Sequence, residues 1–349
     1  MRSTLFHIPT QFELGGATVP LVGWGLLLVL WAVCGGGFFA WHTARHGLRS
    51  AAATLGLPLV IVAALVVWVL PGVADDAGIP VRGYGVLLLA AAAAGTWLSI
   101  VRGRALGFDA DTILALAMEV FLWGLVGARL FYVIEYHEQF FPRGVGLLHA
   151  LPAVLNLAAG GLVVFGSLPT AAWATWRFAR RRGLPLLKLA DCIAPGLLVG
   201  LAIGRVGCFM NGCCYGGPCD LPWAVRFPPQ SPPWLDQVAR GLLPAEPQAW
   251  SLPVHPAQLY AAFDAGLLAV LAVAFTPLAR RAGEVFALVL TLHPISRMLL
   301  EAIRVDEPPA LGTPLSISQL LSLALLMAAV ALWCWIANRP PEFAGRPEP

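Results

Sequence analysis

The sequence is poor in charge. Only 12% of its 349 residues are Asp, Glu, Lys or Arg, whereas 58% are hydrophobic, and the mean hydropathy is +0.76. A soluble globular protein needs far more polar surface than this composition supplies. The scarcity of charge therefore excludes a soluble globule and indicates a protein that crosses a membrane several times.

Two further features are missing. The net charge is only +3 and comes mostly from basic residues in short loops, so nothing indicates a nucleic-acid-binding face. Residues 1–19 lack the basic start, apolar core and small-residue cleavage site of a secretory signal peptide. We therefore expect no nucleic-acid partner, and we expect the first apolar run to be retained in the protein.

Apolar runs dominate what is present. A membrane-spanning helix needs about 20 apolar residues. The sequence has candidates at 20–42, 53–74, 83–102, 111–134, 158–177, 188–206, 254–276, 283–303 and 315–337. The predicted fold is an all-α integral membrane protein.

Charge in the loops predicts the orientation, because cytoplasmic loops are enriched in Lys and Arg. Alternate loops contain Arg45, Arg49, Arg102, Arg104, Arg177, Arg180, Arg181, Arg182, Lys188, Arg280, Arg281 and Arg339. The other loops contain Asp75, Asp76, Glu135, Glu138, Asp220, Asp236, Glu246, Asp306 and Glu307. We expect the N-terminus outside the cell and the C-terminus in the cytoplasm.

A short internal repeat suggests how the chain is divided. The sequence VPLVGWGLLL at 19–28 resembles IPVRGYGVLL at 79–88, and each copy opens a predicted span. We interpret the first copy as part of an N-terminal extension, residues 1–78, with two transmembrane helices. Residues 79–337 would form a seven-helix core, and 338–349 a cytoplasmic tail.

The stretch 204–223, GRVGCFMNGCCYGGPCDLPW, is the most unusual part of the chain. Arg205 stands at the end of an apolar run, and glycines, Asn211 and cysteines follow it. A charged side chain and irregular backbone are costly in lipid unless protein or water receives them. This stretch is therefore predicted to form a functional site.

Four cysteines lie in this predicted loop: Cys208, Cys213, Cys214 and Cys219. On an oxidising side of the membrane they suggest one or two disulfides, with Cys213 or Cys214 pairing with Cys208 or Cys219. Zinc binding is an alternative, although the spacing is not the usual C-x2-C pair. A cysteine nucleophile is a third, but no His or Lys neighbours these thiols in sequence to lower their pKa.

A second polar cluster lies in the run HPISRMLLEAIRVDEP. His293, Arg297 and Glu301 share one helix face at a spacing of four residues, and Arg304 lies one turn further out. An Arg297–Glu301 ion pair between helices would account for two of these residues. It leaves His293 unexplained.

Charges also occur in the span at 111–134, which contains Glu119 and Arg129. Ionisable groups at membrane depth are usually functional or paired. Arg129 could neutralise a lipid phosphate or pair with a carboxylate such as Glu301, whereas Glu119 is expected to be structural.

The remaining outer segments are not predicted to span. Residues 135–157 are too short and interrupted, and suit a segment lying at the headgroup layer. Residues 207–252 form a predicted irregular extracytoplasmic head loop, in which Pro228, Pro229, Pro232 and Pro233 argue against regular helix. His255 then precedes Pro256 at a predicted helix start, where it could cap the helix or take part in catalysis.

Together these motifs resemble a known family. The segments GRVGCFMNG, YGGPCDLPWAVRFP and HPAQLY, the last at 255–260, are similar to the signature region of bacterial prolipoprotein diacylglyceryl transferases. The resemblance covers about residues 79–337, and Tyr84 stands at the tyrosine usual in the family. The chain departs from the family pattern at Phe165, where a histidine or tyrosine is usual, at Cys208 in place of Asn, and at Cys213 in place of Glu.

The resemblance implies an enzyme of the bacterial cytoplasmic membrane. Its expected reaction moves a diacylglyceryl group from phosphatidylglycerol to the lipobox cysteine thiol of a prelipoprotein signal peptide. The products would be a thioether and glycerol 1-phosphate. We expect a monomer surrounded by membrane lipid, with no metal and no cofactor.

Roles follow for the residues singled out. Arg205 and Arg297 are expected to stabilise the departing phosphate, with Arg129 as helper. Asn211, Tyr84, His255 and Arg304 would contact the substrates. Since Phe165 has no ionisable group, His293 is the expected base and Glu301 would orient or assist it.

Two other classes of protein stay open. The departures at Cys208, Cys213 and Phe165 allow a paralogue without transferase activity, which would use the cysteines for thiol redox chemistry or metal handling. The number of spans and the buried charges also allow a transporter. A transporter would place its polar residues near the midplane, whereas these gather toward the predicted outer face.

Overall fold

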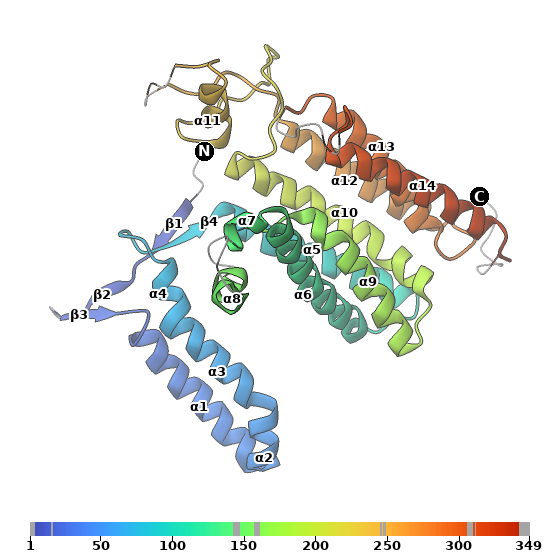
Figure 1. Cartoon of the computed structure of the whole chain (residues 1–349). Coiled ribbons are helices and arrows are strands. Elements are labelled where there is room, and N and C mark those ends of the chain that lie inside the picture. The colour runs from blue at the N-terminus through green and yellow to red at the C-terminus, as the bar shows by residue number, and fades with distance from the viewer. Residues whose placement is uncertain are drawn as a thin grey trace. The chain divides into compact units, whose positions relative to one another are not determined.

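A computed structural model describes residues 4–14, 17–141, 147–156, 161–244, 246, 249–305, 310 and 312–341. The chain forms two compact units, residues 2–85 and residues 86–349, which are described one at a time (Figure 1). Asp306 and Glu307, used above to assign an outer loop, and the tail from residue 342 lie outside the described residues.

The N-terminal unit contains two apolar helical runs. The first is α1 (Leu26–His46), and the second extends over Leu48–Val73. The second run is divided into α2 (Leu48–Ala51), η1 (Ala52–Gly56), α3 (Leu57–Ala64), η2 (Leu65–Val69) and α4 (Leu70–Val73), where η marks a turn of wider π-helix. Both runs are long and apolar enough to cross a membrane, as the sequence predicted.

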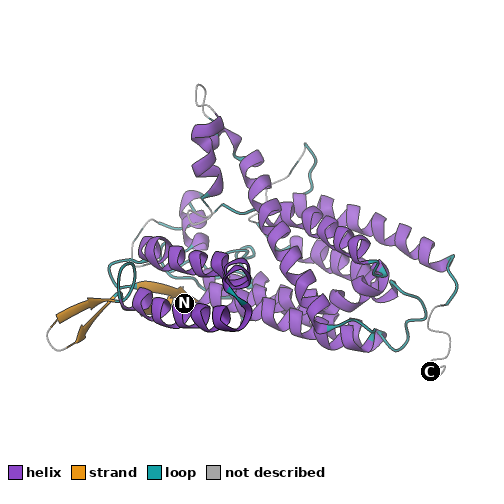
Figure 2. Ribbon diagram, turned by 90° about the horizontal axis from the view of Figure 1, so that it is seen from below, coloured by secondary structure: helices purple, strands orange, loops and turns teal. Residues whose placement is uncertain are grey.

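Four short strands in this unit were not predicted. Strand β1 (Thr4–Ile8) pairs antiparallel with β4 (Ile79–Arg82), and β2 (Gln11–Leu14) pairs antiparallel with β3 (Ala17–Pro20). Figure 2 shows them in orange. The Val-Pro and Ile-Pro dipeptides that open the two repeat copies lie in β3 and β4, so the repeat includes a strand before each helix.

The core unit is built on long helices, and α5 begins just before the boundary between the units. They are α5 (Gly83–Ala105), α6 (Ala110–Glu135), α9 (Val164–Arg182), α10 (Leu186–Asn211), α12 (Ala257–Phe275), α13 (Glu284–Glu301) and α14 (Ile317–Ala337). A helix lies at each of the seven predicted core positions, and five of them are long and apolar enough to cross a membrane, so the described chain has seven candidate spans where the sequence predicted nine. Helices α9 and α13 are less apolar than the other five, because α9 ends in arginines and α13 carries the polar stripe.

Small residues allow two core helices to pack closely. Helices α6 and α9 pack along their lengths, and Gly127 and Gly166 meet at the crossing. A Cβ atom at Gly127 would lie 2.4 Å from the carbonyl oxygen of Gly166 and 2.1 Å from Oγ1 of Thr170. Glycines at such a crossing let two backbones approach each other, as is typical of membrane helices.

Asp191, in the second turn of α10, joins this helix to the start of α13. Its two carboxylate oxygens accept hydrogen bonds from the backbone N–H groups of Gly283 (2.6 Å) and Phe286 (2.8 Å), at the start of α13. These N–H groups have no partner within the helix, so a carboxylate stabilises them. Arg102 of α5 donates to the Asp191 carbonyl oxygen at 3.1 Å and to Oγ1 of Thr276 at 2.9 Å.

The helix ends near the predicted site correct two expectations. Helix α10 continues through Cys208 to Asn211 and stops at Gly212, whose φ is +77°. Cys208 therefore lies on the helix and not in the loop. A short helix, α11 (Pro232–Ala239), lies where prolines argued against one. Pro232 and Pro233 occupy its first turn, where a missing N–H costs nothing.

The segments that were not expected to span were predicted more closely. After α6 ends at Glu135, the described residues up to 156 form α7 (His137–Phe140) and α8 (Leu147–Leu155), which are both too short to span. Around α11, the rest of the head loop has no long element among the described residues.

The close crossing of α6 and α9 is testable by mutation. Gly127→Ala should lower the stability of the detergent-purified protein by about 1–3 kcal/mol, because the added methyl group overpacks the crossing. Gly266→Ala on α12 is the matched control, since a Cβ there would meet nothing within 4 Å. Thermal unfolding followed by fluorescence measures both. An unchanged midpoint for Gly127→Ala would contradict this packing.

Candidate active site

Three arginines and one cysteine from distant parts of the sequence line one small cavity. Arg205 comes from α10, Arg297 from α13, Arg304 from the segment after α13, and Cys214 from the loop after α10. Apolar side chains of α12 and α13 complete the wall. The cavity has a volume of about 10 Å³, which is enough for one water-sized group. The structure thus brings together the two arginines that the sequence singled out.

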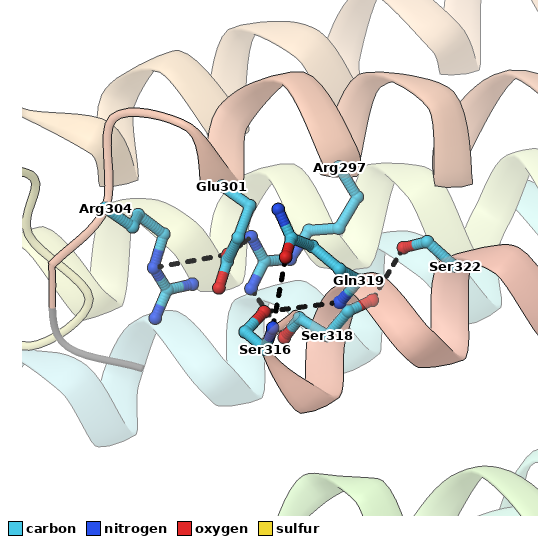
Figure 3. A network of polar contacts seen from close by, with 7 residues as sticks. All are labelled: Arg297, Glu301, Arg304, Ser316, Ser318, Gln319 and Ser322. Carbon is cyan, nitrogen blue, oxygen red and sulfur yellow. Dashed lines mark hydrogen bonds and ion pairs between the residues drawn. The ribbon is translucent and has the colours of Figure 1, made fainter. Parts of the chain in front are cut away.

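Glu301 organises two of these arginines (Figure 3). It forms an ion pair with Arg297 one turn earlier on α13, and its Oε2 lies 3.9 Å from Nε of Arg304. The side chains of all three residues are at most 14% exposed. A carboxylate buried among guanidinium groups offsets the cost of placing positive charge in a low-dielectric region.

Helix α14 holds Arg297 from the other side. Nη2 of Arg297 donates to Oγ of Ser318 at 2.8 Å, and Ser318 lies in the first turn of α14. That turn is fixed by a capping box, in which Ser316 and Gln319 satisfy each other's backbone N–H groups. Figure 3 shows the three side chains gathered at this end of the helix. The guanidinium orientation therefore depends on two helices.

Arg205 differs from its neighbours in the cavity. It is half-buried, and within the described residues it makes no hydrogen bond and no ion pair. A guanidinium has five N–H donors. Arg205 therefore brings donors and a positive charge that an anion entering the cavity can use.

His293 lies one turn before Arg297 on the same face of α13. Its Nδ1 atom is buried and has no hydrogen-bond partner in the part of the chain that the structure describes. Charges from Asp264, Arg205 and Arg297 act on the ring. Asp264 of α12 is in turn bonded to Oγ of Ser296 at 2.7 Å. The imidazole is thus close to the arginines, and its Nδ1 atom is not used by any described residue.

The loop after α10 gathers three thiols. The sulfur atoms of Cys208, Cys213 and Cys214 all lie within 4.8 Å of one another, and Cys219 is not part of the group. All four cysteines are free thiols, so the structure does not contain the predicted disulfides. Gln258 of α12, which is fully buried, fixes the loop by donating from Nε2 to the carbonyl oxygen of Cys213 at 2.7 Å.

Cys214 has an unusual environment within this group. Its backbone φ is +60°, in the left-handed region that side chains other than glycine rarely adopt. Hydrogen bonds from Cys208 and Cys213, together with the positive charges of Arg205 and Arg304, lower the pKa of the Cys214 thiol. Burial of the sulfur opposes this effect. The loop therefore places the Cys214 sulfur at the cavity that the arginines line.

Comparison with known proteins identifies the family. The sequence profile of the prolipoprotein diacylglyceryl transferases matches residues 72–335, which is most of the chain and includes every side chain of the cavity. The chain belongs to the prolipoprotein diacylglyceryl transferase family.

Individual relatives agree with this assignment. A protein from Rhodopirellula baltica is 39% identical over 252 residues, which are 70% of this chain and 50% of that protein. One from Gloeobacter violaceus is 31% identical over 77% of this chain and 93% of its own length, and one from Clostridium tetani is 26% identical over 72% and 92%. Each is named phosphatidylglycerol–prolipoprotein diacylglyceryl transferase. The resemblance predicted from the sequence is confirmed, as is the assignment to a class of enzymes, the transferases.

Among the side chains predicted for this transferase site, Arg129 lies elsewhere. It donates hydrogen bonds of 2.7–3.1 Å to the backbone carbonyls of Ala153, Val154, Asn156 and Gly161, and it lies over the rings of Tyr132 and Phe140. Carbonyl groups at the C-terminal end of α8 attract a cation. Arg129 fastens α8 to α6, and it does not line the arginine cavity.

Three predicted substrate contacts also lie outside the cavity wall. Asn211 is exposed at the last residue of α10, beside Cys213. His255 is half-buried, with Nδ1 3.5 Å from the hydroxyl of Tyr260, and its backbone pairs with Gly216 and Gly217. Tyr84 opens α5 and belongs to the N-terminal unit. Their roles toward substrate stay predictions.

Sequence reasoning missed three members of the site. Ser318 and Gln258 are ordinary polar residues near helix starts, and only the packing of α14 and α12 shows that they bind Arg297 and the cysteine loop. Cys214 was interpreted as a disulfide partner. Its signal was present in the sequence, since Cys214 lies nine residues after Arg205 and two after Gly212, a glycine that can turn the chain back.

Glu119, which was expected to be structural, pairs with Arg177 of α9.

The buried ion pair between Arg297 and Glu301 leads to a prediction for stability. Glu301→Gln keeps the size of the side chain and removes the carboxylate that Arg297 and Arg304 both face. We expect a loss of about 3–5 kcal/mol, the usual effect of breaking a buried ion pair.

Asp236→Asn is the matched control, since the Asp236–Arg240 pair has the same spacing and Arg240 is 45% exposed. It should cost no more than about 0.3–0.5 kcal/mol. Thermal unfolding in detergent compares the two variants. Equal, small losses would show that Glu301 does not hold the arginines.

Proposed function

We propose that this protein transfers a diacylglyceryl group from phosphatidylglycerol to the cysteine thiol of a prelipoprotein. The observation that carries the proposal is the meeting of Arg205 and Arg297, from α10 and α13, in one cavity, with Arg205 unpartnered within the described residues. The names of the relatives supply the substrates. Their chemistry then defines what the cavity residues must do.

Phosphatidylglycerol carries one negative charge on its phosphate, and that group must leave. As the bond from the diacylglyceryl carbon to the phosphate oxygen breaks, a second negative charge develops on the leaving group. Guanidinium groups stabilise phosphate oxygens through paired, charge-assisted hydrogen bonds, which are strongest away from bulk water. Arg205 has free donors for this task, and Arg297 is already held in place by Glu301 and Ser318.

The nucleophile is the thiol of the incoming signal peptide. A free thiol is mostly protonated at neutral pH, so a base that takes its proton accelerates the attack. The Nδ1 atom of His293 is available for this proton. A new bond forms from sulfur to the diacylglyceryl carbon, the carbon–oxygen bond to phosphate breaks, and glycerol 1-phosphate leaves with the electron pair.

The reaction requires a particular place in the cell. A lipid headgroup and an exported peptide meet at the outer face of the bacterial cytoplasmic membrane. The basic loops predict that the cavity end of α10 faces that side, with the N-terminus outside and the C-terminus in the cytoplasm. We place the protein there as a monomer, with Tyr84, Asn211 and His255 as contacts for the rest of the substrates.

Replacing either arginine tests the proposal directly. Arg205→Ala and Arg297→Ala should each reduce transfer to a lipobox peptide by at least about 100-fold, because each removes a group that stabilises the leaving phosphate. The assay uses the purified protein with labelled phosphatidylglycerol.

Arg181→Ala is the control, since Arg181 lies in the exposed last turn of α9. It should keep full activity. Unchanged transfer by a correctly inserted Arg205→Ala variant would refute the phosphate role.

Replacing His293 and replacing His255 should slow transfer to different extents. His293→Phe should slow transfer by about 100-fold or more, the usual contribution of a base. His255→Phe should have a smaller effect, because His255 mainly joins the loop to Tyr260 and α12. Single-turnover rates measure both variants, and equal rates would remove His293 as the base.

A further inference from the structure

The three thiols of Cys208, Cys213 and Cys214 form a cluster that the proposed function has not used. Their sulfur atoms lie within 4.8 Å of one another. Sulfur atoms bound to one tetrahedral zinc ion at about 2.3 Å are separated by about 3.8 Å. The cluster therefore needs only small rotations of its side chains to hold an ion.

The surroundings keep this cluster in place. Cys208 belongs to the last helical turn of α10, and Gly212 in the left-handed conformation turns the chain back toward it. The buried amide of Gln258 anchors the carbonyl oxygen of Cys213. Nearby positive charges of Arg205 and Arg304 act on Cys214. Three thiolates and a divalent ion carry a net charge of minus one, which these arginines offset.

We propose that Cys208, Cys213 and Cys214 bind a zinc ion whose fourth position accepts the thiol of the incoming peptide. Thiolate ligands select zinc and other soft ions. Structural zinc sites are closed by four protein ligands, whereas catalytic sites use three and leave one position open. The cysteine that could close this site, Cys219, lies outside the group.

The position of Cys214 connects the ion to the reaction. Cys214 lines the same cavity as Arg205 and Arg297, so an ion on its sulfur lies at the edge of the proposed phosphate site. A thiol that binds zinc gives up its proton, here to His293, and remains nucleophilic. The bound sulfur would then form the bond to the diacylglyceryl carbon while the carbon–oxygen bond to phosphate breaks, and glycerol 1-phosphate would leave with the electron pair. The thioether product is a poor ligand for zinc and would dissociate.

This inference rests on the proposed function and departs from the expectation of a metal-free enzyme. It also rules out a simpler use of Cys214. If Cys214 itself carried the diacylglyceryl group, a stable thioether would have to be broken in the second step, and a thiolate is a poor leaving group from carbon. A metal site avoids that step.

Metal content is the first test. Wild-type protein, purified from the membrane in a reducing buffer with added zinc sulfate and then desalted, should hold one zinc ion per chain by mass spectrometry. Cys208→Ser, Cys213→Ser and Cys214→Ser should each lose it. Cys219→Ser is the matched control and should keep it. Elution volume and circular dichroism identify any variant that has not folded.

Cobalt gives the second test, which does not depend on activity. Cobalt-substituted wild-type protein should show thiolate charge-transfer and tetrahedral absorption bands. A lipobox peptide should change these bands when it binds, and the same peptide with Ser in place of Cys should not. Removing the metal with a chelator should slow transfer by about 30-fold or more, since about 3% of a thiol of ordinary pKa is ionised at pH 7. Added zinc should restore it.

The outcomes separate the two proposals. A wild-type protein that transfers lipid but holds no zinc, or whose thiols are joined in a disulfide, overturns the metal site and leaves the proposed function intact. If the cobalt bands do not change when the Cys peptide is added, the proposal of an open fourth position for the peptide thiol is overturned. A protein that binds zinc through the three thiols but never transfers lipid refutes the proposed function itself.

Discussion

The site depends on one constraint, which is that several guanidinium groups must be kept charged in a nearly buried place. Charge of one sign in such a place is unstable without a counter-ion. Glu301 meets this need by facing both Arg297 and Arg304. Ser318 and the capped start of α14 then fix the direction in which Arg297 points. Much of the core, from α10 to α14, serves to assemble this small charged region.

Arg205 is the useful exception to this neutralisation. It lies in the second-last turn of α10 and lines the cavity with Arg297 and Arg304, and its donors are unused within the described residues. An enzyme that must stabilise charge only as it develops benefits from a preorganised group with no strong partner in the resting state. The same region gathers His293 and the three thiols, so acid–base and sulfur chemistry lie beside the anion site.

The sequence predicted the parts of this structure that depend on composition and period. Long apolar runs gave the helices, and the four-residue spacing of His293, Arg297 and Glu301 placed them correctly on one face of α13. Features that depend on particular contacts were missed. Pro232 and Pro233 start a helix instead of preventing one, α10 continues through two glycines to Asn211, and the strands beside the repeat copies have no clear alternating pattern.

The structure brings together the arginines at the centre of the predicted site and leaves other predicted members outside the cavity. Arg205 was singled out by its cost in a membrane, and Arg297 and Arg304 by their spacing along an otherwise apolar helix, and both signals are local in the sequence. Arg129 carried the same signal but satisfies it with carbonyl groups of α8, which no sequence pattern showed. The partners Gln258 and Ser318, and the closeness of three thiols, arise only when α10, α12, α13 and α14 pack together.

The central claim is that Arg205 and Arg297 hold the phosphate of the donor lipid between them. A structure determined by electron cryo-microscopy in nanodiscs that contain phosphatidylglycerol tests it most directly. The account predicts density for a lipid phosphate within hydrogen-bond distance of both guanidinium groups. A headgroup bound elsewhere, with both arginines free of it, would contradict the account.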